Sequence, residues 1–158
     1  MTLTTYKVKF VSQTNSIVLI FSSFAALFIG ISTIPYNPIS KSFSTIIVII
    51  LLGIVWLLWQ KFVTGRTEWT LEKNEIKIIW TKKFALTNKK DLNIQWSEIQ
   101  NISRGFEPHY YNLKIKLNSG DTIRFYHDIL TTRDDFENLI VALYQTLSKK
   151  KNFNQRTL

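Results

Sequence analysis

The chain has 158 residues, 46% of them hydrophobic, and its 20 Lys and Arg against 11 Asp and Glu give a formal net charge of +9 at pH 7. It contains no cysteine, which excludes disulfide bonds, a thiol nucleophile, Cys-ligated zinc and an iron–sulfur cluster. The first sixty residues carry only Lys7, Lys9 and Lys41 as charged side chains. The averages therefore combine an apolar N-terminal part with a polar C-terminal part.

Residues 16–34 and 42–60 form two uncharged, strongly apolar runs. At a rise of about 1.5 Å per residue, each run covers about 28 Å as a helix, close to the roughly 30 Å hydrocarbon core of a bilayer. Prolines between the runs favour a break in the helix. We therefore predict a transmembrane helical hairpin over residues 16–60, preceded by a cytoplasmic segment, residues 1–15. A cleavable signal peptide is disfavoured because a second apolar run follows directly.

The positive charges around the two runs predict their orientation. Lys7 and Lys9 precede the first run, and Lys61 and Arg66 follow the second. Between the runs there is only Lys41. Because the cytoplasmic flanks of membrane helices carry an excess of Lys and Arg, we predict a multi-pass protein of the bacterial inner (cell) membrane with both termini in the cytoplasm.

Two smaller patterns lie within the apolar runs. Trp56 and Trp59 stand one turn apart near the end of the second run, which is typical of anchors at the membrane interface. Ser22, Ala26 and Gly30 recur every four residues and predict a stripe for close helix packing, either against this chain's second helix or against another copy. Neither run contains an ionisable side chain, which argues against a proton relay or an ion-coupled transporter.

From Thr67 onward the apolar residues alternate with polar ones, as in half-buried β-strands. Asn118-Ser119-Gly120-Asp121 is a strong turn signal between two such runs. We therefore predict antiparallel strands. The alternating runs lie at residues 69–71, 76–80, 92–96, 113–117 and 123–125.

A helix is predicted from Thr132, where Thr-Arg-Asp-Asp supplies an N-cap oxygen and acidic residues for the first turn. Apolar residues then recur at helical spacing on one face, which must be buried against the sheet. The predicted domain covers residues 67–148, and a basic polar tail follows at residues 149–158. The residues of the apolar face are Phe136, Leu139, Ile140, Leu143 and Leu147.

Three segments carry a resemblance to a known family: TEWTLEKNEIKIIW at 67–80, IQWSEIQNIS at 94–103 and YYNLKIKLNSGDTIRFY at 110–126. With the preceding apolar runs and the final helix, they resemble the bacterial membrane-anchored pleckstrin-homology-like proteins, including the YcxB-like group. The resemblance implies an α+β fold in which about seven strands form a small antiparallel barrel or sandwich, capped by a C-terminal helix. It implies no established chemistry.

Basic residues after the apolar runs form two clusters, which have two interpretations. They are either part of a solvated surface or contacts for anionic lipid. Inositol-lipid recognition by the first strand pair is disfavoured, because Lys73 stands between Glu72 and Glu75. No nucleic-acid-binding motif accompanies the positive charge, so nucleic acid is not an expected partner. The clusters are Lys82, Lys83, Lys89 and Lys90, and Lys149, Lys150 and Lys151.

His109 and His127 are the only histidines, and the acids nearest to them in sequence are Glu107, Asp121 and Asp128. A hydrolase or metal enzyme would have to be built on these residues. Surface or turn roles fit them better, because no nucleophile elbow, zinc motif, P-loop or dinucleotide fingerprint is present. We therefore predict no enzyme activity, no cofactor and no metal.

The sequence favours a non-enzymatic interaction or scaffold module held beside a lipid bilayer, with a protein partner that the sequence does not name. The alternative is a small regulatory or immunity protein of the membrane that acts through its hairpin. The oligomeric state stays open.

Overall fold

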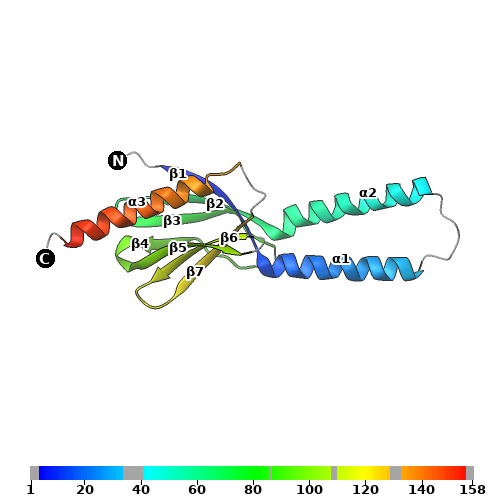
Figure 1. Cartoon of the computed structure of the whole chain (residues 1–158), viewed down its shortest axis with the longest axis horizontal. Coiled ribbons are helices and arrows are strands. Elements are labelled where there is room, and N and C mark those ends of the chain that lie inside the picture. The colour runs from blue at the N-terminus through cyan, green and yellow to red at the C-terminus, as the bar shows by residue number, and fades with distance from the viewer. Residues whose placement is uncertain (1–3, 34–40, 86, 108–109, 129–132, 156–158) are drawn as a thin grey trace.

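The computed structural model describes residues 4–33, 41–85, 87–107, 110–128 and 133–155, and its described side chains leave out those of 29–33, 41–45, 47–48 and 151–155. Two helices form an arm beside a sheet covered by a third helix (Figure 1). In chain order the elements are β1 (Thr5–Val11), α1 (Gln13–Thr33), α2 (Lys41–Leu58), the π-helical turn η1 (Trp59–Val63), β2 (Thr64–Leu71), β3 (Glu75–Lys82), β4 (Leu92–Gln95), the 3-10 turn η2 (Trp96–Glu98), β5 (Ile99–Glu107), β6 (Tyr110–Leu117), β7 (Thr122–Asp128) and α3 (Phe136–Gln155).

The strands form a seven-stranded antiparallel sheet in the order β4-β3-β2-β1-β7-β6-β5. The N-terminal strand β1 lies at its centre. It pairs with β2 along its whole length, from Thr5 opposite Thr70 to Val11 opposite Thr64. It pairs with β7 only at Phe10 and Val11. The central strand therefore joins the two halves of the sheet near one end and lies apart from β7 at the other.

The core of the sheet domain, by which we mean β1 to β7 with α3, follows from strand alternation. In β1, Val8 and Phe10 are buried while Lys7 and Lys9 lie outside the core, as expected when successive side chains point to opposite faces. The predicted turn between β6 and β7 is confirmed, and its Gly120 has a φ of +93°, which favours glycine. The fully buried large side chains of the domain include Trp69, Ile76, Ile78, Leu113, Ile115 and Leu139.

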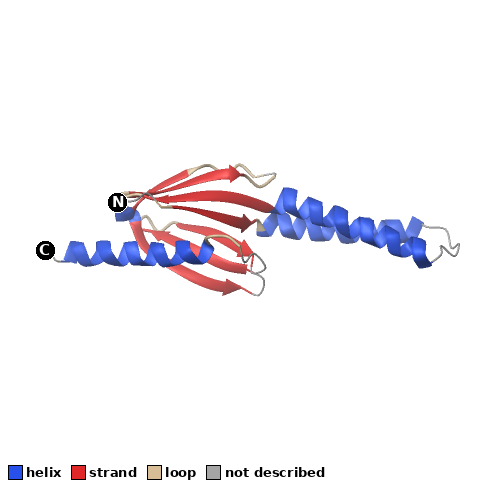
Figure 2. Cartoon of the chain, turned by 90° about the horizontal axis from the view of Figure 1, so that it is seen from above, coloured by secondary structure: helices blue, strands red, loops and turns tan. Residues whose placement is uncertain are grey.

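Helix α3 packs on the apolar face of the sheet and contacts β1 and β5 (Figures 1 and 2). Its predicted apolar face, from Phe136 to Leu147, is buried in the core. The helix begins at Phe136, not at Thr132, because the Asp134 and Asp135 side chains are bonded to the backbone of β1. A helix on one face of an antiparallel sheet gives this α+β domain a single hydrophobic core.

The predicted barrel or sandwich is wrong, because the structure is an open sheet with β4 and β5 as its two edges. The N-terminal segment 1–15 was also wrongly interpreted as a simple flank. Thr5–Val11 is the central strand, so the sheet domain extends well outside the predicted range 67–148. The physical reason is that Tyr6, Val8 and Phe10 alternate with polar residues. Their side chains therefore lie on one face of β1 and join the hydrophobic core between the neighbouring strands β2 and β7.

The predicted transmembrane hairpin is also wrong. In the ranges that the structure describes, no helix is both long and apolar enough to cross a membrane. Part of the first run serves the sheet domain instead, since Ser16 in the first turn of α1 is buried. The second run ends its α-helix at Leu58 and continues as the π-helical turn. The predicted multi-pass location in the inner membrane, with both termini cytoplasmic, is overturned by the same finding.

Candidate interaction surface

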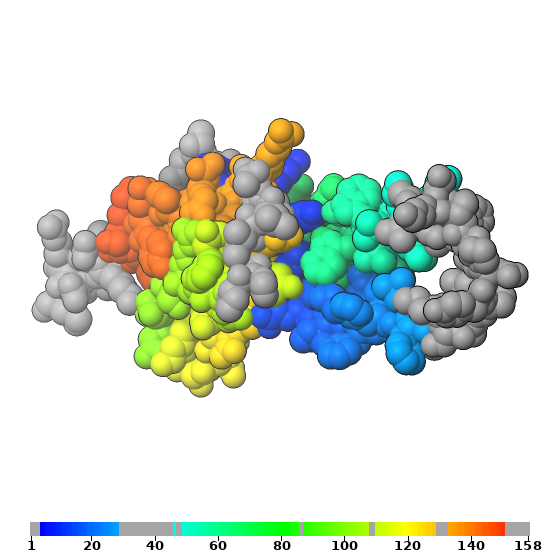
Figure 3. Space-filling model, turned by 45° about the vertical axis from the view of Figure 1, so that its right-hand side comes forward, coloured from blue at the N-terminus to red at the C-terminus, as the bar shows by residue number. Residues whose placement is uncertain are grey.

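The α1–α2 hairpin exposes most of its described large apolar side chains. Phe21, Phe28 and Trp56 are 72%, 75% and 61% exposed, although side chains of these types are usually buried to a large extent. The hairpin extends from the sheet domain as an arm (Figure 3). Its large exposed apolar residues are Ile17, Val18, Ile20, Phe21, Phe24, Leu27, Phe28, Ile46, Ile49, Ile50, Leu51, Leu52, Ile54, Trp56 and Leu57. Those of the sheet domain are Ile79, Phe106, Val141 and Tyr144.

A buried polar joint connects the hairpin to the sheet domain. The Asn15 side-chain amide donates hydrogen bonds to the carbonyl oxygens of Phe62 and Ala85, at 2.8 and 2.7 Å. The backbone amide of Ser12 donates to the carbonyl of Val63 at 2.9 Å. These bonds link the start of α1 to the chain that leaves α2 and to the segment after β3, so they fix where α1 begins and where α2 ends relative to the sheet.

The small-residue stripe and the tryptophan pair predicted in the hairpin are found in different environments. Ser22 and Ala26 are exposed, so they do not pack closely on α2, and the surroundings of Gly30 lie outside the described side chains. The Ser22 hydroxyl donates to the carbonyl of Val18 at 2.7 Å. Trp56 is exposed and Trp59 is half-buried in η1. The role of the two tryptophans as membrane-interface anchors stays a prediction.

Three neighbouring strands each place a cation where the hairpin meets the sheet, in addition to Lys61 in η1, and we call these strand cations, Lys9, Arg66 and Lys82, the base cations. Lys9 is the register partner of Arg66, and Arg66 is the register partner of Lys82. The Lys82 ammonium contacts the carbonyl of Gln60 and lies 3.4 Å from the Thr64 hydroxyl. Burial lowers the pKa of Lys82, and the charges of Arg66 and Lys9 lower that pKa further.

The structure separates the lysines that the sequence placed in two basic clusters. Lys82 lies at the hairpin base, and the exposed Lys83 follows it at the end of β3. Lys89 and Lys90 are exposed in the segment between β3 and β4. The other cluster lies at the far end of the domain. There Lys149 is exposed, the Lys150 ammonium contacts the carbonyl of Lys73, and the Lys151 side chain lies outside the described set.

A cavity of about 280 Å³ lies beside the start of α1. Lys89 and Arg124 line it together with the aromatic side chains of Trp80, Phe84 and Phe125. The Nε1 atom of Trp80 is buried and has no hydrogen-bond partner among the described residues. None of the described residues that line the cavity carries a carboxylate. Its lining therefore places further positive charge near the hairpin base.

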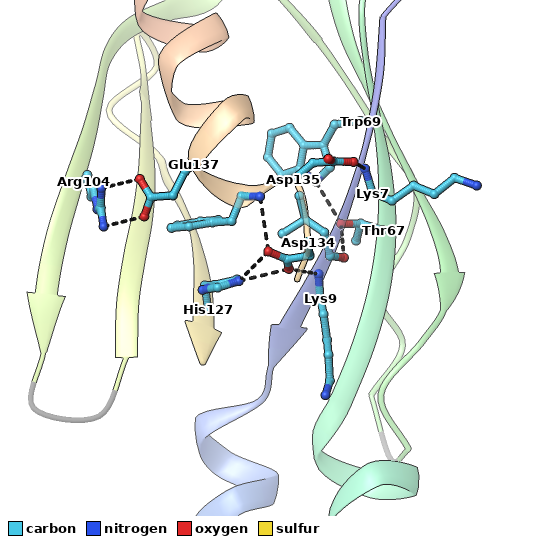
Figure 4. Close-up of polar contacts among 11 residues, drawn as sticks. Lys7, Lys9, Thr67, Trp69, Arg104, His127, Asp134, Asp135 and Glu137 are labelled. Carbon is cyan, nitrogen blue, oxygen red and sulfur yellow. Dashed lines mark hydrogen bonds and ion pairs between the residues drawn. The ribbon is translucent and has the colours of Figure 1, made fainter. Parts of the chain in front are cut away.

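His127 is part of a buried polar cluster that joins β1, β7 and α3 (Figure 4). Its Nε2 atom lies 3.0 Å from both carboxylate oxygens of Asp134, and its ring stacks on Phe136 with centroids 4.1 Å apart. His127 is 3% exposed as a residue and lines neither described cavity. This arrangement supports a structural role. The other histidine, His109, lies outside the described residues.

The partner of His127 is Asp134, an acid that the sequence analysis did not connect with this histidine. Its carboxylate also accepts hydrogen bonds from the backbone amides of Lys9, at 2.8 Å, and Phe136, at 3.2 Å. Burial raises the pKa of this carboxyl, but the hydrogen bonds from His127 and from the Lys9 amide outweigh burial and leave the pKa below its usual value. The neighbouring Asp135 carboxylate accepts from the amide of Lys7 at 2.8 Å. The two acids therefore bind the part of β1 that lies away from β7.

The comparisons with known proteins leave the family open. No protein-family model matches the sequence, and no curated protein or solved structure is significantly similar to it. The resemblance to the pleckstrin-homology-like proteins therefore stays a hypothesis. Among the described residues, no group of three or more His, Asp or Glu side chains could hold a metal ion. The most distinctive surface features of the described residues are the exposed hairpin and the base cations.

Proposed function

We propose that the protein is a non-enzymatic interaction module whose α1–α2 hairpin binds lipid and thereby holds the sheet domain beside a lipid surface, where the domain serves a protein partner. The exposure of the hairpin's large apolar side chains supports this proposal most directly. Soluble monomers rarely expose an apolar patch larger than a few hundred Å² unless it is an interaction site. Acyl chains would cover this surface without requiring a complementary polar pattern.

The distribution of charge supports lipid over an acidic or basic protein surface. No charged side chain lies between residues 9 and 41, or between 41 and 61. The base cations lie where the hairpin ends, and the first carboxylate in the sequence is Glu68. An apolar arm with cations at one end matches the acyl chains and the anionic headgroups of a lipid surface. The buried joint at Asn15 would then keep the sheet domain close to the headgroups.

Co-sedimentation of the purified full-length chain with phospholipid vesicles tests this proposal. The chain should sediment with the vesicles, and the double variant Phe21→Ser/Phe24→Ser should bind several-fold more weakly, because it removes two exposed aromatic side chains from the hairpin. The matched control is Ile79→Ser/Phe106→Ser, which removes two exposed apolar side chains from the sheet domain. The control should bind as the unchanged chain does.

Two results would contradict the proposal. One is a full-length chain that stays in the supernatant at all vesicle concentrations. The other is a stable dimer or larger oligomer in analytical ultracentrifugation that the hairpin variant abolishes while vesicle binding stays unchanged. That second result would assign the apolar surface to another copy of the chain.

A further inference from the structure

The base cations place three positive charges side by side in three neighbouring strands. Lys9 belongs to β1, Arg66 to β2 and Lys82 to β3, and the register pairs each with the next. Like charges directly opposite each other in a sheet are destabilising. Such a group therefore needs a compensating negative charge or a functional reason.

The described part of the chain supplies no carboxylate to this group. Glu68, the nearest acid along β2, lies 3.6 Å from the Lys7 ammonium. Asp134 and Asp135 bind the backbone amides of Lys9 and Lys7. In Figure 4 the Lys9 side chain extends away from Asp134 toward the start of α1 and the end of α2. The base cations are thus not neutralised by an ion pair among the described residues.

The three cations differ in what else they do. The Lys82 ammonium donates to the carbonyl of Gln60 at the end of the hairpin. There the negative end of the helix dipole also stabilises a cation. Lys9 is half-buried and Arg66 is exposed. Burial lowers the pKa of Lys82 most, and the charges of Arg66 and Lys9 lower it further, which agrees with their proximity. Lys9 and Arg66 are therefore the two cations that remain available for an external anion.

We propose that Lys9 and Arg66, supported by Lys82, bind the phosphate group of an anionic phospholipid headgroup. This inference rests on the proposed function, because the hairpin's contact with lipid brings the headgroups to the base cations. Arg offers a planar fork of donors for phosphate oxygens, and Lys offers a compact charge beside it. The same phosphate chemistry occurs in soluble phosphate, so the experiment includes both sources.

The experiment compares binding of the full-length chain to two vesicle types, phosphatidylcholine alone and an equal mixture with phosphatidylglycerol. The unchanged chain should bind the anionic vesicles more tightly, and added salt should reduce this preference. Lys9→Gln/Arg66→Gln should weaken binding to the anionic vesicles by roughly 25-fold, because each of the two cations contributes roughly fivefold to binding near an anionic surface. Its binding to neutral vesicles should not change.

The matched control is Lys73→Gln/Lys149→Gln, which removes the same charge from the opposite end of the sheet domain. Lys73 lies in the turn after β2, and β2 runs away from the hairpin for roughly 25 Å. Lys149 lies in the last part of α3, where Lys150 contacts the carbonyl of Lys73. Binding of this control should change by less than about threefold, since screening at physiological salt removes charge effects beyond roughly 8 Å. Circular dichroism is used to check that both variants fold. Lys82 is left unchanged because its ammonium contacts η1.

The outcomes separate this inference from the proposed function. Equal binding of the unchanged chain and Lys9→Gln/Arg66→Gln to anionic vesicles overturns the headgroup site and leaves the hairpin's lipid contact standing. Failure to bind either vesicle type overturns both. A thermal stabilisation by inorganic phosphate that Lys9→Gln/Arg66→Gln abolishes, without any preference for anionic vesicles, overturns the lipid headgroup as the occupant and assigns the site to soluble phosphate.

Discussion

The sheet domain and the α1–α2 hairpin use the same kinds of apolar side chain with opposite results. Phe10 in β1 is 1% exposed, whereas Phe21 in α1 is 72% exposed. In the strands, apolar residues alternate with polar ones, so each strand has one apolar face. These faces pack against one another and against the apolar face of α3. The helices carry apolar residues on all sides, so one helix cannot cover the other completely. The period of an apolar pattern, rather than its amount, decides whether a segment can bury itself.

The joint between the two regions marks the change from one pattern to the other. Ser12 and Asn15 directly precede the first apolar run and Ser16 begins it, and all three donate hydrogen bonds to backbone carbonyls. Buried polar groups require such partners. We therefore expect the sheet domain and the hairpin to respond differently to the same kind of change.

The largest difference is expected from removal of whole segments. Deleting residues 1–11 removes the central strand, and with it the partner of both β2 and β7, so the remaining domain should not fold. Replacing residues 13–62 by Asn-Gly should leave a folded domain, because Ser12 and Val63 are already adjacent across the β1–β2 pair and Asn-Gly suits a two-residue hairpin turn. Circular dichroism and urea unfolding measure both.

A folded domain after deletion of β1 would contradict the assigned core. Loss of folding after the hairpin replacement would show that the sheet domain depends on the hairpin, and the two regions could then not be treated as separable.

Matched truncations of phenylalanine should give the next largest difference. Phe10→Ala should lower the free energy of unfolding by about 3–5 kcal/mol, since it opens a cavity among Trp69, Phe125 and Phe136. Phe21→Ala should change that free energy by less than about 0.5 kcal/mol, because its side chain has few contacts to lose. Equal effects in denaturant titrations would show that the hairpin is covered within the folded chain.

Asp134→Asn should lower the free energy of unfolding at neutral pH by about 1–3 kcal/mol, because a charged acceptor of buried hydrogen bonds is lost. The pKa of Asp134 is lowered in the folded state. Its ionised form therefore adds stability above the unfolded-state pKa of about 3.9, and that stability is lost as the pH falls through the folded-state pKa.

The variant should accordingly lose less stability than the unchanged chain between pH 7 and acidic pH. Urea unfolding across this range measures the difference, and Asp121→Asn in the exposed β6–β7 turn is the control. Parallel pH profiles for Asp134→Asn and the unchanged chain would contradict the assigned role of the carboxylate.

The smallest effect is expected at the surface of the sheet domain. The Arg104 guanidinium makes two 2.7 Å hydrogen bonds with Glu137 and lies 4.3 Å from the centroid of the Tyr111 ring. Arg104→Lys keeps the charge but loses the paired geometry, so the free energy of unfolding should fall by about 0.5–1 kcal/mol. A larger loss in thermal unfolding would mean that this exposed pair matters as much as a core contact.

The sequence predicted much of the domain after residue 67. The strand alternation, the turn at Gly120 and the apolar face of α3 all reflect local patterns, and local patterns are visible in one sequence. Trp96 is buried, as its strand pattern indicated. The overall closure into a barrel was wrong, because whether β4 and β5 meet depends on long-range geometry that no local pattern contains.

The central strand was missed although its signal was present. Tyr6, Val8 and Phe10 alternate around Lys7 and Lys9, as in a strand. The two lysines were interpreted instead as a charged flank of the first apolar run. The base cations were missed for a related reason, because Lys9 and Arg66 lie 57 positions apart in the sequence and become neighbours only through strand register.

The pairing of β1 with β2 also determines when the domain can form during synthesis. Strand β1 leaves the ribosome before both of its neighbours, because β2 begins only at Thr64 and β7 only at Thr122. The Asp134 and Asp135 carboxylates that bind its remaining amides come later still. The entropy cost of closing such long loops is met before the contacts form, which slows folding. One edge of β1 thus stays unpaired until β7 and these two acids have been synthesised, so the nascent chain depends on much later residues to protect this strand.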